Sequence, residues 1–409
     1  MEKQEHTMTQ SPETKVTPDP RTFLADFTFE EMDSDPYPRF KRMREECPIA
    51  YFEPYGQWFV SLWDDCFTLG KDTSMLASKI TEQVFGPSIL SADGSVHRDL
   101  HRAVDPPLRP RMVPNYTDAF IRPAVRRYLE ALKPQGKADA SLDLLEKVSV
   151  AIVGDVMGLT NVDDDRRQEW FHALAGSLAD VFDDDDWKRR AQLTIEDSDE
   201  YFRNRIEELT AAPDDSLLSH MIHGDLAGRP PRTYDDLIGT LRVLITGGFQ
   251  EPGHACAATL YGLLQNPEQM KAVKANPDEL LAPALQEGLR WLPPLSQTEK
   301  ITTKEITLHG MTFPAGTEFV LLIPSANYDE SRFENPEQFN IFRTKKDNAS
   351  FGFGLHHCSG HALARHLGAI VLQEVIEALP NLRLDPDREP VITGFMLRGV
   401  RELPVIWDV

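Results

Sequence analysis

One cysteine, Cys358, lies in the part of the sequence with the clearest chemical signal. It belongs to the segment FGFGLHHCSG, residues 351–360, and the helical pattern HALARHLGAIVLQEVIEAL follows directly. A sulfur just before a helix N-terminus meets unpaired N–H groups and the positive end of the helix dipole, and both favour the thiolate. A thiolate is a nucleophile or a metal ligand. Gly352, Gly354 and Gly360 allow tight turns and close approach to a large flat group, against which Phe351 can pack.

Two other uses of this sulfur are open at this point. Cys358 could be a buried structural thiol behind a glycine-rich turn, or a hydrolase nucleophile with His356 or His357 as its base. Residues one or two positions apart in such a turn rarely reach the geometry of a nucleophile and its base. We therefore favour metal ligation over hydrolysis.

A second chemical signal lies in the apolar helical pattern LRVLITGGFQEPGHACAATLYGLL, Leu241 to Leu264. Pro252 lacks an N–H group and its ring crowds the carbonyl of Gly248, so the helix is predicted to kink or bulge there. Glu251 stands beside the kink, and a carboxyl that takes and returns protons can act as a relay. The alternative is a solvated carboxylate beside an ordinary proline kink.

The cysteine segment resembles the haem-binding loop of cytochromes P-450, F-x-x-G-x-H/R-x-C-x-G. Phe351, Gly354, His356, Cys358 and Gly360 occupy its five defined positions. The resemblance implies haem b, bound to iron through Cys358 and contacted by Phe351, Gly352, His356 and Gly360. It also implies the P-450 fold, mainly α with small β-sheets, as a single large catalytic domain over residues 22–409.

Further landmarks occur in the order found in that family. Glu287 and Arg290 form an E-x-x-R pair, one helical turn apart and therefore on one face. The stretch SANYDESRFENPEQFNIFR resembles the later meander, where Arg343 takes the place of the arginine that joins the pair. The ending LPVIW, Leu403 to Trp407, is similar to the family's last strand.

The residues that would hold the haem propionates depart from the family pattern. The usual H-x-x-x-R is His97 to His101 here, with histidine in place of arginine, and the arginine after the E-x-x-R helix is replaced by Lys300. His97, His101, His356 and Lys300 can all donate to a propionate, although a neutral histidine holds it less firmly than a bidentate arginine. We therefore expect haem affinity to depend on pH.

The central helix departs as well. The family pattern A/G-G-x-D/E-T places an acid and an alcohol over the haem, whereas this chain has Gly247, Gly248, Phe249, Gln250 and Glu251. An amide takes the acid's place and a carboxylate the alcohol's. The resemblance therefore implies that Gly248, Gln250, Glu251 and Pro252 form the oxygen-activating site.

The sequence QEPGH, residues 250–254, is similar to the bacterial guaiacol-type aromatic O-demethylases. The similarity extends to Glu287–Trp291, Ser325–Asn327, Arg398–Gly399 and Trp407–Val409. It implies O2-dependent conversion of guaiacol or 4-alkylguaiacols, small lignin-derived methoxyaromatics, to catechols and formaldehyde. The pocket positions that the resemblance implies are Ile80, Val84, Phe85, Ile89, Val243, Gly247, Leu295, Phe395 and Leu397. Aliphatic residues at Leu178 and Leu397 predict tolerance of a para-alkyl chain.

Electrons must come from another protein, because the chain has no dinucleotide-binding fingerprint, flavin domain or iron–sulfur cysteine cluster. We expect a separate NAD(P)H-dependent reductase or ferredoxin. Three alternatives remain open: a peroxide-driven peroxygenase, a hydroxylase of another small apolar molecule, and a haem-thiolate sensor without turnover.

Composition sets the outer limits. The 409 residues carry a formal charge of −22, with 41% hydrophobic and 26% charged residues, which is typical of a globular protein. We expect no nucleic-acid or membrane partner and a cytoplasmic location.

Several shorter segments also carry predictions. Residues 1–21 are predicted to be a disordered tail. Cys47, Cys66 and Cys256 are predicted to be buried thiols, and the acidic runs 163–165 and 183–186 are predicted to be solvated turns. Helical periodicity covers Phe120–Leu132 and Leu367–Leu379, and strand-like segments cover Tyr51–Leu62, Ile306–Val320 and Phe395–Trp407.

Overall fold

The structure, a computed structural model, describes residues 18–77, 81–179 and 185–409. Its α-helices are α1 Phe29–Ser34, α2 Tyr37–Glu46, α3 Trp63–Lys71, α4 Glu82–Phe85, α5 Gly94–Leu108, α6 Arg122–Leu132, α7 Glu146–Met157, α8 Asp164–Ala179, α9 Asp185–Ala211, α10 Leu217–His223, α11 Tyr234–Phe249, α12 Glu251–Gln265, α13 Pro267–Ala275, α14 Pro277–Trp291, α15 Ile323–Asn327 and α16 His361–Ala378. Short 3₁₀ or π turns are η1 Glu53–Tyr55, η2 Val113–Asn115, η3 Thr117–Ile121, η4 Lys133–Gln135, η5 Ala140–Leu145 and η6 Gly354–His356.

The strands are short and form small sheets. They are β1 Ile49–Phe52, β2 Gln57–Val60, β3 Leu76–Ala77, β4 Lys137–Asp139, β5 Gln297–Ile301, β6 Ile306–Leu308, β7 Met311–Phe313, β8 Glu318–Leu322, β9 Arg383–Leu384, β10 Val391–Thr393, β11 Gly399–Glu402 and β12 Pro404–Ile406. The largest sheet has the order β1-β2-β8-β5-β3, in which only β2 and β8 run parallel. The expected fold class, mainly α with small β-sheets in one large domain, is confirmed.

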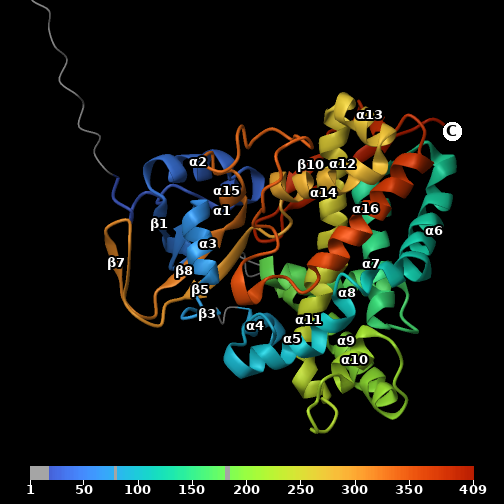
Figure 1. The fold of residues 1–409 in the computed structure, drawn as a ribbon, viewed down its shortest axis with the longest axis horizontal. Coiled ribbons are helices and arrows are strands. Elements are labelled where there is room, and N and C mark those ends of the chain that lie inside the picture. Colours follow the sequence, from blue (N-terminus) through green and yellow to red (C-terminus); the bar gives the residue numbers. More distant parts are fainter. Residues whose placement is uncertain (1–17, 78–80, 180–184) are drawn as a thin grey trace, which may run out of the picture.

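The sheet and the helical core occupy opposite sides of the molecule (Figure 1). The five-stranded sheet packs with α1, α2, α3 and α15 on one side, and α6, α7, α11, α12, α14 and α16 form the helical body on the other. The main apolar core lies among these helices, and two smaller cores flank the sheet. The cysteine segment lies where the two sides meet.

The helix after the cysteine follows the predicted pattern. Leu367, Val371 and Val375 recur at helical spacing and are buried in the main core. The helix α16 ends at Ala378, and Leu379 is already extended (φ −114°, ψ 97°) because it precedes Pro380. The other predicted helix, Phe120–Leu132, is observed as α6 after the π-turn η3.

The central helix is broken rather than continuous. The helix α11 ends at Phe249 and α12 begins at Glu251, so Gln250 is the joint. Pro252 lies in the first turn of α12, where its missing N–H is no loss. A Cβ at Gly253 would lie 2.9 Å from the carbonyl oxygen of Leu145, so α12 presses directly on the joint between η5 and α7. The predicted kink is confirmed as a one-residue interruption between two helices.

The N-terminal boundary differs from the expectation of a tail up to residue 21. The N–H of Tyr51 donates to the carbonyl oxygen of Pro20 (2.8 Å), and the Arg21 guanidinium lies 5.3 Å from the centre of the Trp58 ring. The ordered chain therefore begins before Thr22, while residues 1–17 lie outside the described residues.

The remaining expectations concern single side chains and short runs. Cys47, Cys66 and Cys256 are buried free thiols, as predicted. In the first acidic run, Asp163 accepts a hydrogen bond from the N–H of Arg166 (2.8 Å) in the first turn of α8. Residues 183 and 184 of the second run lie outside the described residues. Within the described ranges, no helix is both long and apolar enough to cross a bilayer.

Candidate functional site

The cysteine segment folds as a tight loop pinned to helix α3. The N–H of Cys358 donates to the carbonyl oxygen of Phe351 (2.9 Å), which closes the loop. Gly352 (φ 70°) and Gly354 (φ 66°) adopt left-handed conformations, and a Cβ at Gly354 would lie 2.6 Å from the carbonyl oxygen of Gly70. Gly360 is different. Its φ is −81°, so the turn does not require glycine there, but a Cβ would lie 3.7 Å from the Cys358 sulfur.

The sulfur of Cys358 faces an internal cavity. The side chain is accessible from that cavity although protein surrounds it on its other sides. Burial raises the pKa of the free thiol to about 12, and the charge of Glu251 adds to this, while N–H groups of Gly360 and His361 act in the opposite direction. In the metal-free side chain desolvation therefore outweighs the helix N-terminus, whereas the predicted thiolate is that of a metal-bound cysteine. A metal ion that replaces the proton restores the anion.

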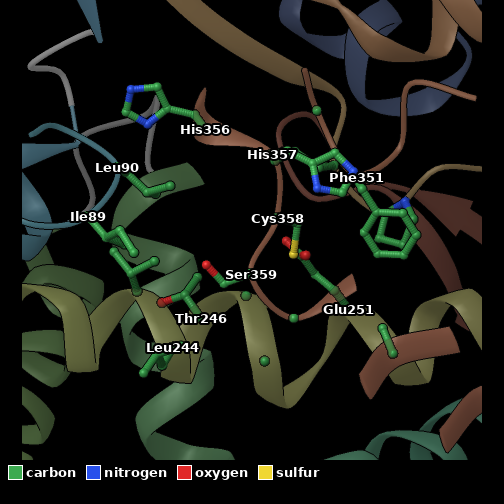
Figure 2. A pocket seen from close by; sticks show the side chains of 18 of the residues that line it. Ile89, Leu90, Leu244, Thr246, Glu251, Phe351, His356, His357, Cys358 and Ser359 are labelled. Carbon is green, nitrogen blue, oxygen red and sulfur yellow. The ribbon is translucent and has the colours of Figure 1, made fainter. Parts of the chain in front are cut away.

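The cavity has a volume of about 320 Å³ and lies between the cysteine loop and the broken central helix. Gly247, Gly248, Glu251 and Pro252 line it from α11 and α12. Figure 2 shows the Glu251 carboxyl turned toward the Cys358 sulfur. Burial raises the pKa of Glu251 to about 8, so at neutral pH this carboxyl holds its proton.

Most of the expected pocket residues line this cavity, and some do not. The nominated residues that line it are Phe85, Ile89, Val243, Gly247, Leu295 and Leu397. Val84 packs against the main core instead, and Phe395 packs edge-on against Phe29 (5.4 Å between ring centres) and Tyr55 (5.3 Å). In the terminal hairpin the neighbouring Met396 takes the lining place of Phe395. Ile80 and the side chain of Leu178 lie outside the described residues.

Sequence reasoning missed several lining residues. Val153 and Met157 come from α7, and Leu217 comes from the start of α10. Nothing in their local sequence separates them from ordinary core residues, since only the tertiary packing brings them to the cavity. Thr246 could have been found, because it lies one residue before the glycine pair on the predicted central helix.

The four expected propionate donors gather at one end of the cavity. The His97 ring centre lies 4.2 Å from that of His101 and 4.3 Å from that of His356. His101, His356 and Lys300 line the cavity, whereas His97 is buried behind them and its Nε2 has no hydrogen-bond partner within the described structure. Burial and neighbouring positive charge lower the pKa values of His97 and His356 to about 4, so both rings are neutral donors.

The E-x-x-R pair is buried and completed by the third residue. Arg290 donates to both carboxylate oxygens of Glu287 (2.7 and 2.8 Å), and both side chains are at most 5% exposed. Arg343 donates to Glu287 Oε1 (3.3 Å) from the meander. Arg290 also reaches the carbonyl oxygens of Pro336 (2.7 Å) and Asn327 (3.1 Å). The three charged residues thus tie the meander to α14.

Gln250 does not line the cavity. Its side chain is 2% exposed and points away from the cavity, toward α7, where Nε2 donates to Glu146 Oε2 (2.8 Å). Its oxygen accepts from Arg401 (3.3 Å) on β11. Of the two residues that replace the family's acid and alcohol, only Glu251 therefore faces the cysteine.

Comparison with known proteins agrees with this geometry. The family model "Cytochrome P450" matches residues 70–393. The polyketide biosynthesis cytochrome P450 PksS of Bacillus subtilis is 26% identical, covering 92% of this chain and 96% of that protein. The cytochrome P450 monooxygenase PikC of Streptomyces venezuelae is 26% identical over 92% of each chain. The solved structure of PksS superposes with a TM-score of 0.83 at 25% identity, covering 93% of this chain and 98% of the other.

The chain therefore belongs to the cytochrome P450 family of haem-thiolate monooxygenases. Proteins of this family bind haem b and use O2 with electrons from redox partners, and the residues present fit that cofactor. Cys358 presents a soft sulfur ligand to the cavity, and Phe351 and Gly352 line the same wall. The unpartnered Nε2 of His97 lies beside the other donors, as a site for carboxylate groups requires.

Proposed function

We propose that this monooxygenase O-demethylates small methoxyaromatics, guaiacol or 4-alkylguaiacols, to catechols and formaldehyde. The observation that carries the proposal is the pairing of the Glu251 carboxyl with the Cys358 sulfur across a mostly aliphatic cavity. The motif QEPGH that creates this pairing is the one by which the chain resembles aromatic O-demethylases. PksS is named for polyketide biosynthesis, and another relative, 29% identical over 71% of this chain, is a steroid monooxygenase.

Haem b, when bound, would supply the oxygen-activating chemistry, and Cys358 would hold its iron through the sulfur. The chain's own residues provide the surroundings. His101, His356 and Lys300 would hold the propionates, with His97 behind them, and Phe351 would pack against the ring. Gly247 and Gly248 border the cavity with backbone alone, and a Cβ at Gly248 would lie 3.0 Å from the Val153 side chain.

Glu251 is the group that moves protons in this proposal. Its carboxyl lies where the family places an alcohol, and a carboxyl can both donate a proton and take one back. Pro252 holds it there, since a proline in the first turn of α12 enforces the break that turns Glu251 toward the cavity. Water is kept from the site by the aliphatic wall of Val243, Leu295 and Leu397.

The same wall defines the substrate. Val243, Leu295 and Leu397 present apolar surface suited to an arene, and Thr298 lines the same cavity. The Thr246 hydroxyl donates to the carbonyl oxygen of Arg242 (3.0 Å), so it can offer the substrate's phenol only an acceptor. Leucine at 397 leaves space that an aromatic side chain would fill, so a para-alkyl chain is accommodated. We expect guaiacol and 4-propylguaiacol to turn over at comparable rates.

The test uses the haem-loaded protein and a panel of methoxybenzenes. Each compound is titrated while the Soret band is followed for displacement of water from ferric iron, and formaldehyde is then measured with a ferredoxin and its reductase as electron source. Veratrole and toluene serve as compounds with two methoxy groups and with none. Binding of guaiacols without formaldehyde would refute the proposal. Formaldehyde formed with hydrogen peroxide alone would show the peroxygenase alternative instead.

A further inference from the structure

The amide that replaces the family's acid on the central helix is held by a carboxylate from another helix. Gln250 Nε2 donates to Glu146 Oε2 (2.8 Å), and Glu146 is the first residue of α7. The carboxylate is 3% exposed. Position 250 itself carries no negative charge, but the Glu146 carboxylate lies 2.8 Å from the Gln250 amide nitrogen. Glu146 is distant in sequence from the central helix.

Three donors converge on this carboxylate. Besides Gln250, Gln168 Nε2 donates to Glu146 Oε1, and His172 Nε2 lies 2.8 Å from the same oxygen. Gln168 and His172 lie one turn apart on α8, and the His172 side chain is 45% exposed. Burial raises the pKa of Glu146, but the hydrogen bonds and the charge of His172 outweigh it and bring the pKa to about 2. Glu146 is therefore ionised.

Residues of β11 and α12 surround this contact. Arg401 on β11 donates to the other end of the Gln250 amide (3.3 Å), so both polar atoms of that amide are engaged. His254 on α12 packs against Gly399, and its charge interactions reach Glu146, His172 and Arg401. A Cβ at Gly253 would lie 3.2 Å from the Glu146 Cα, so the backbone of α12 rests on the first residue of α7.

The geometry points to Glu146 as a positioning residue for the oxygen-side break: its carboxylate orients Gln250 and thereby the adjoining Glu251. Gln250 is the single residue between α11 and α12, so its position sets the direction in which α12 starts. Glu251 is the first residue of α12, and its carboxyl faces Cys358. This inference rests on the proposed role of Glu251 but not on the identity of the substrate.

An exchange of acid and amide tests the inference. In Glu146→Gln, the new amide has only one oxygen to accept hydrogen bonds from Gln168, His172 and Gln250. Its NH2 group therefore faces one of these donors, and that hydrogen bond is lost. In Gln250→Glu, two carboxylates stand 2.8 Å apart. In the double exchange, the amide on α7 donates to a carboxylate at the break, and Arg401 acquires a charged partner. Both single variants should therefore disturb the break, and the double variant should restore it.

Two readouts are needed. The first is the product ratio: the amount of formaldehyde divided by the amount of hydrogen peroxide formed while the same amount of NADH is consumed, with 4-propylguaiacol as substrate. One lost hydrogen bond to a charged group corresponds to about a tenfold change, so the ratio should fall about tenfold in each single variant and return to within about twofold of wild type in the double. The second is the electron paramagnetic resonance spectrum of the ferric holoenzyme, whose g-values should shift in the single variants and return in the double.

Controls separate positioning from folding. Glu169→Gln removes an exposed charge from α8 beside Gln168 and should change neither readout. His172→Gln removes one partner of Glu146 from a half-exposed position and should shift the ratio in the same direction by about threefold. It also serves where Glu146→Gln does not fold.

Unchanged g-values and a ratio within twofold of wild type in the single variants would overturn the inference. The inference would also be overturned if the product ratio and g-values of the double variant were as far from wild type as those of the more affected single variant. If no methoxyarene is demethylated, the spectra still decide the role of Glu146, whereas the proposed substrate class fails on its own.

Discussion

The buried Glu287–Arg290 pair allows a quantitative prediction for Glu287→Gln. The Arg290 side chain is 2% exposed and would keep its carbonyl acceptors but lose its carboxylate. Removing one partner of a buried ion pair costs about 3–5 kcal/mol, because the other charge stays buried without compensation. Unfolding entropy of roughly 2.1 cal/mol/K per residue gives about 0.9 kcal/mol/K for 409 residues. The Tm should therefore fall by about 3–6 °C.

Differential scanning calorimetry of the haem-loaded protein measures this shift, and the ratio of Soret to protein absorbance reports haem retention. The matched control is Glu402→Gln. Its carboxylate pairs with Arg388 at 3.1 Å, but the two side chains are 43% and 53% exposed, so the change in stability should stay below about 0.5 kcal/mol. A Tm shift below 1 °C for Glu287→Gln, or equal shifts for both variants, would show that burial of the pair does not set its contribution.

Three further predictions follow from single contacts. Glu146 has a pKa of about 2 in the folded protein against 4.5 ordinarily, so its stabilisation is complete above pH 4.5 and is lost as the pH falls toward 2. Between pH 4.5 and pH 2 the unfolding free energy should fall in both proteins, because other paired carboxyl groups titrate too, but the fall should be larger in wild type than in Glu146→Gln by an amount on the order of 3 kcal/mol. Gly354→Ala should lower the haem content, because Gly354 has a left-handed conformation and the new Cβ would lie 2.6 Å from the carbonyl oxygen of Gly70. The control is Gly316→Ala: Gly316 is also left-handed, but its Cβ would meet open space, so haem content should be retained. Leu397→Phe should raise the KM for 4-propylguaiacol about tenfold more than the KM for guaiacol, as measured by formaldehyde release. Equal increases for both substrates would argue against Leu397 as the residue that contacts the para-alkyl chain.

The parts of the site that sequence predicts are those carried by local pattern. The cysteine loop and the break at Pro252 depend on residues within a few positions of one another, so proline and glycine chemistry and helical periodicity reveal them. The lining residues of the helical pattern before the glycine pair, such as Val243, follow from the same period.

The parts that sequence does not predict depend on contacts between distant segments. Phe395 was expected in the pocket, yet its neighbour Met396 lines it, because Phe29 and Tyr55 form an aromatic site that takes the Phe395 ring. The burial of Cys358 is likewise not visible in the sequence. The helix N-terminus is visible in the sequence, but the desolvation that outweighs it is a property of the folded cavity.

The acid of the central helix shows the same limit in a functional setting. Read along the chain, Gln250 looks like the loss of a carboxylate, because the amide occupies the position where the family carries an acid. In the folded protein the Gln250 amide donates a hydrogen bond to the carboxylate of Glu146, which lies more than a hundred residues earlier in the chain. An ionised group next to a helix break needs compensation from its surroundings, and α8 supplies it through Gln168 and His172. The charge at this break therefore depends on residues of several packed helices. Substitutions of Gln168 or His172 on α8 should alter the chemistry of a site that these residues do not touch.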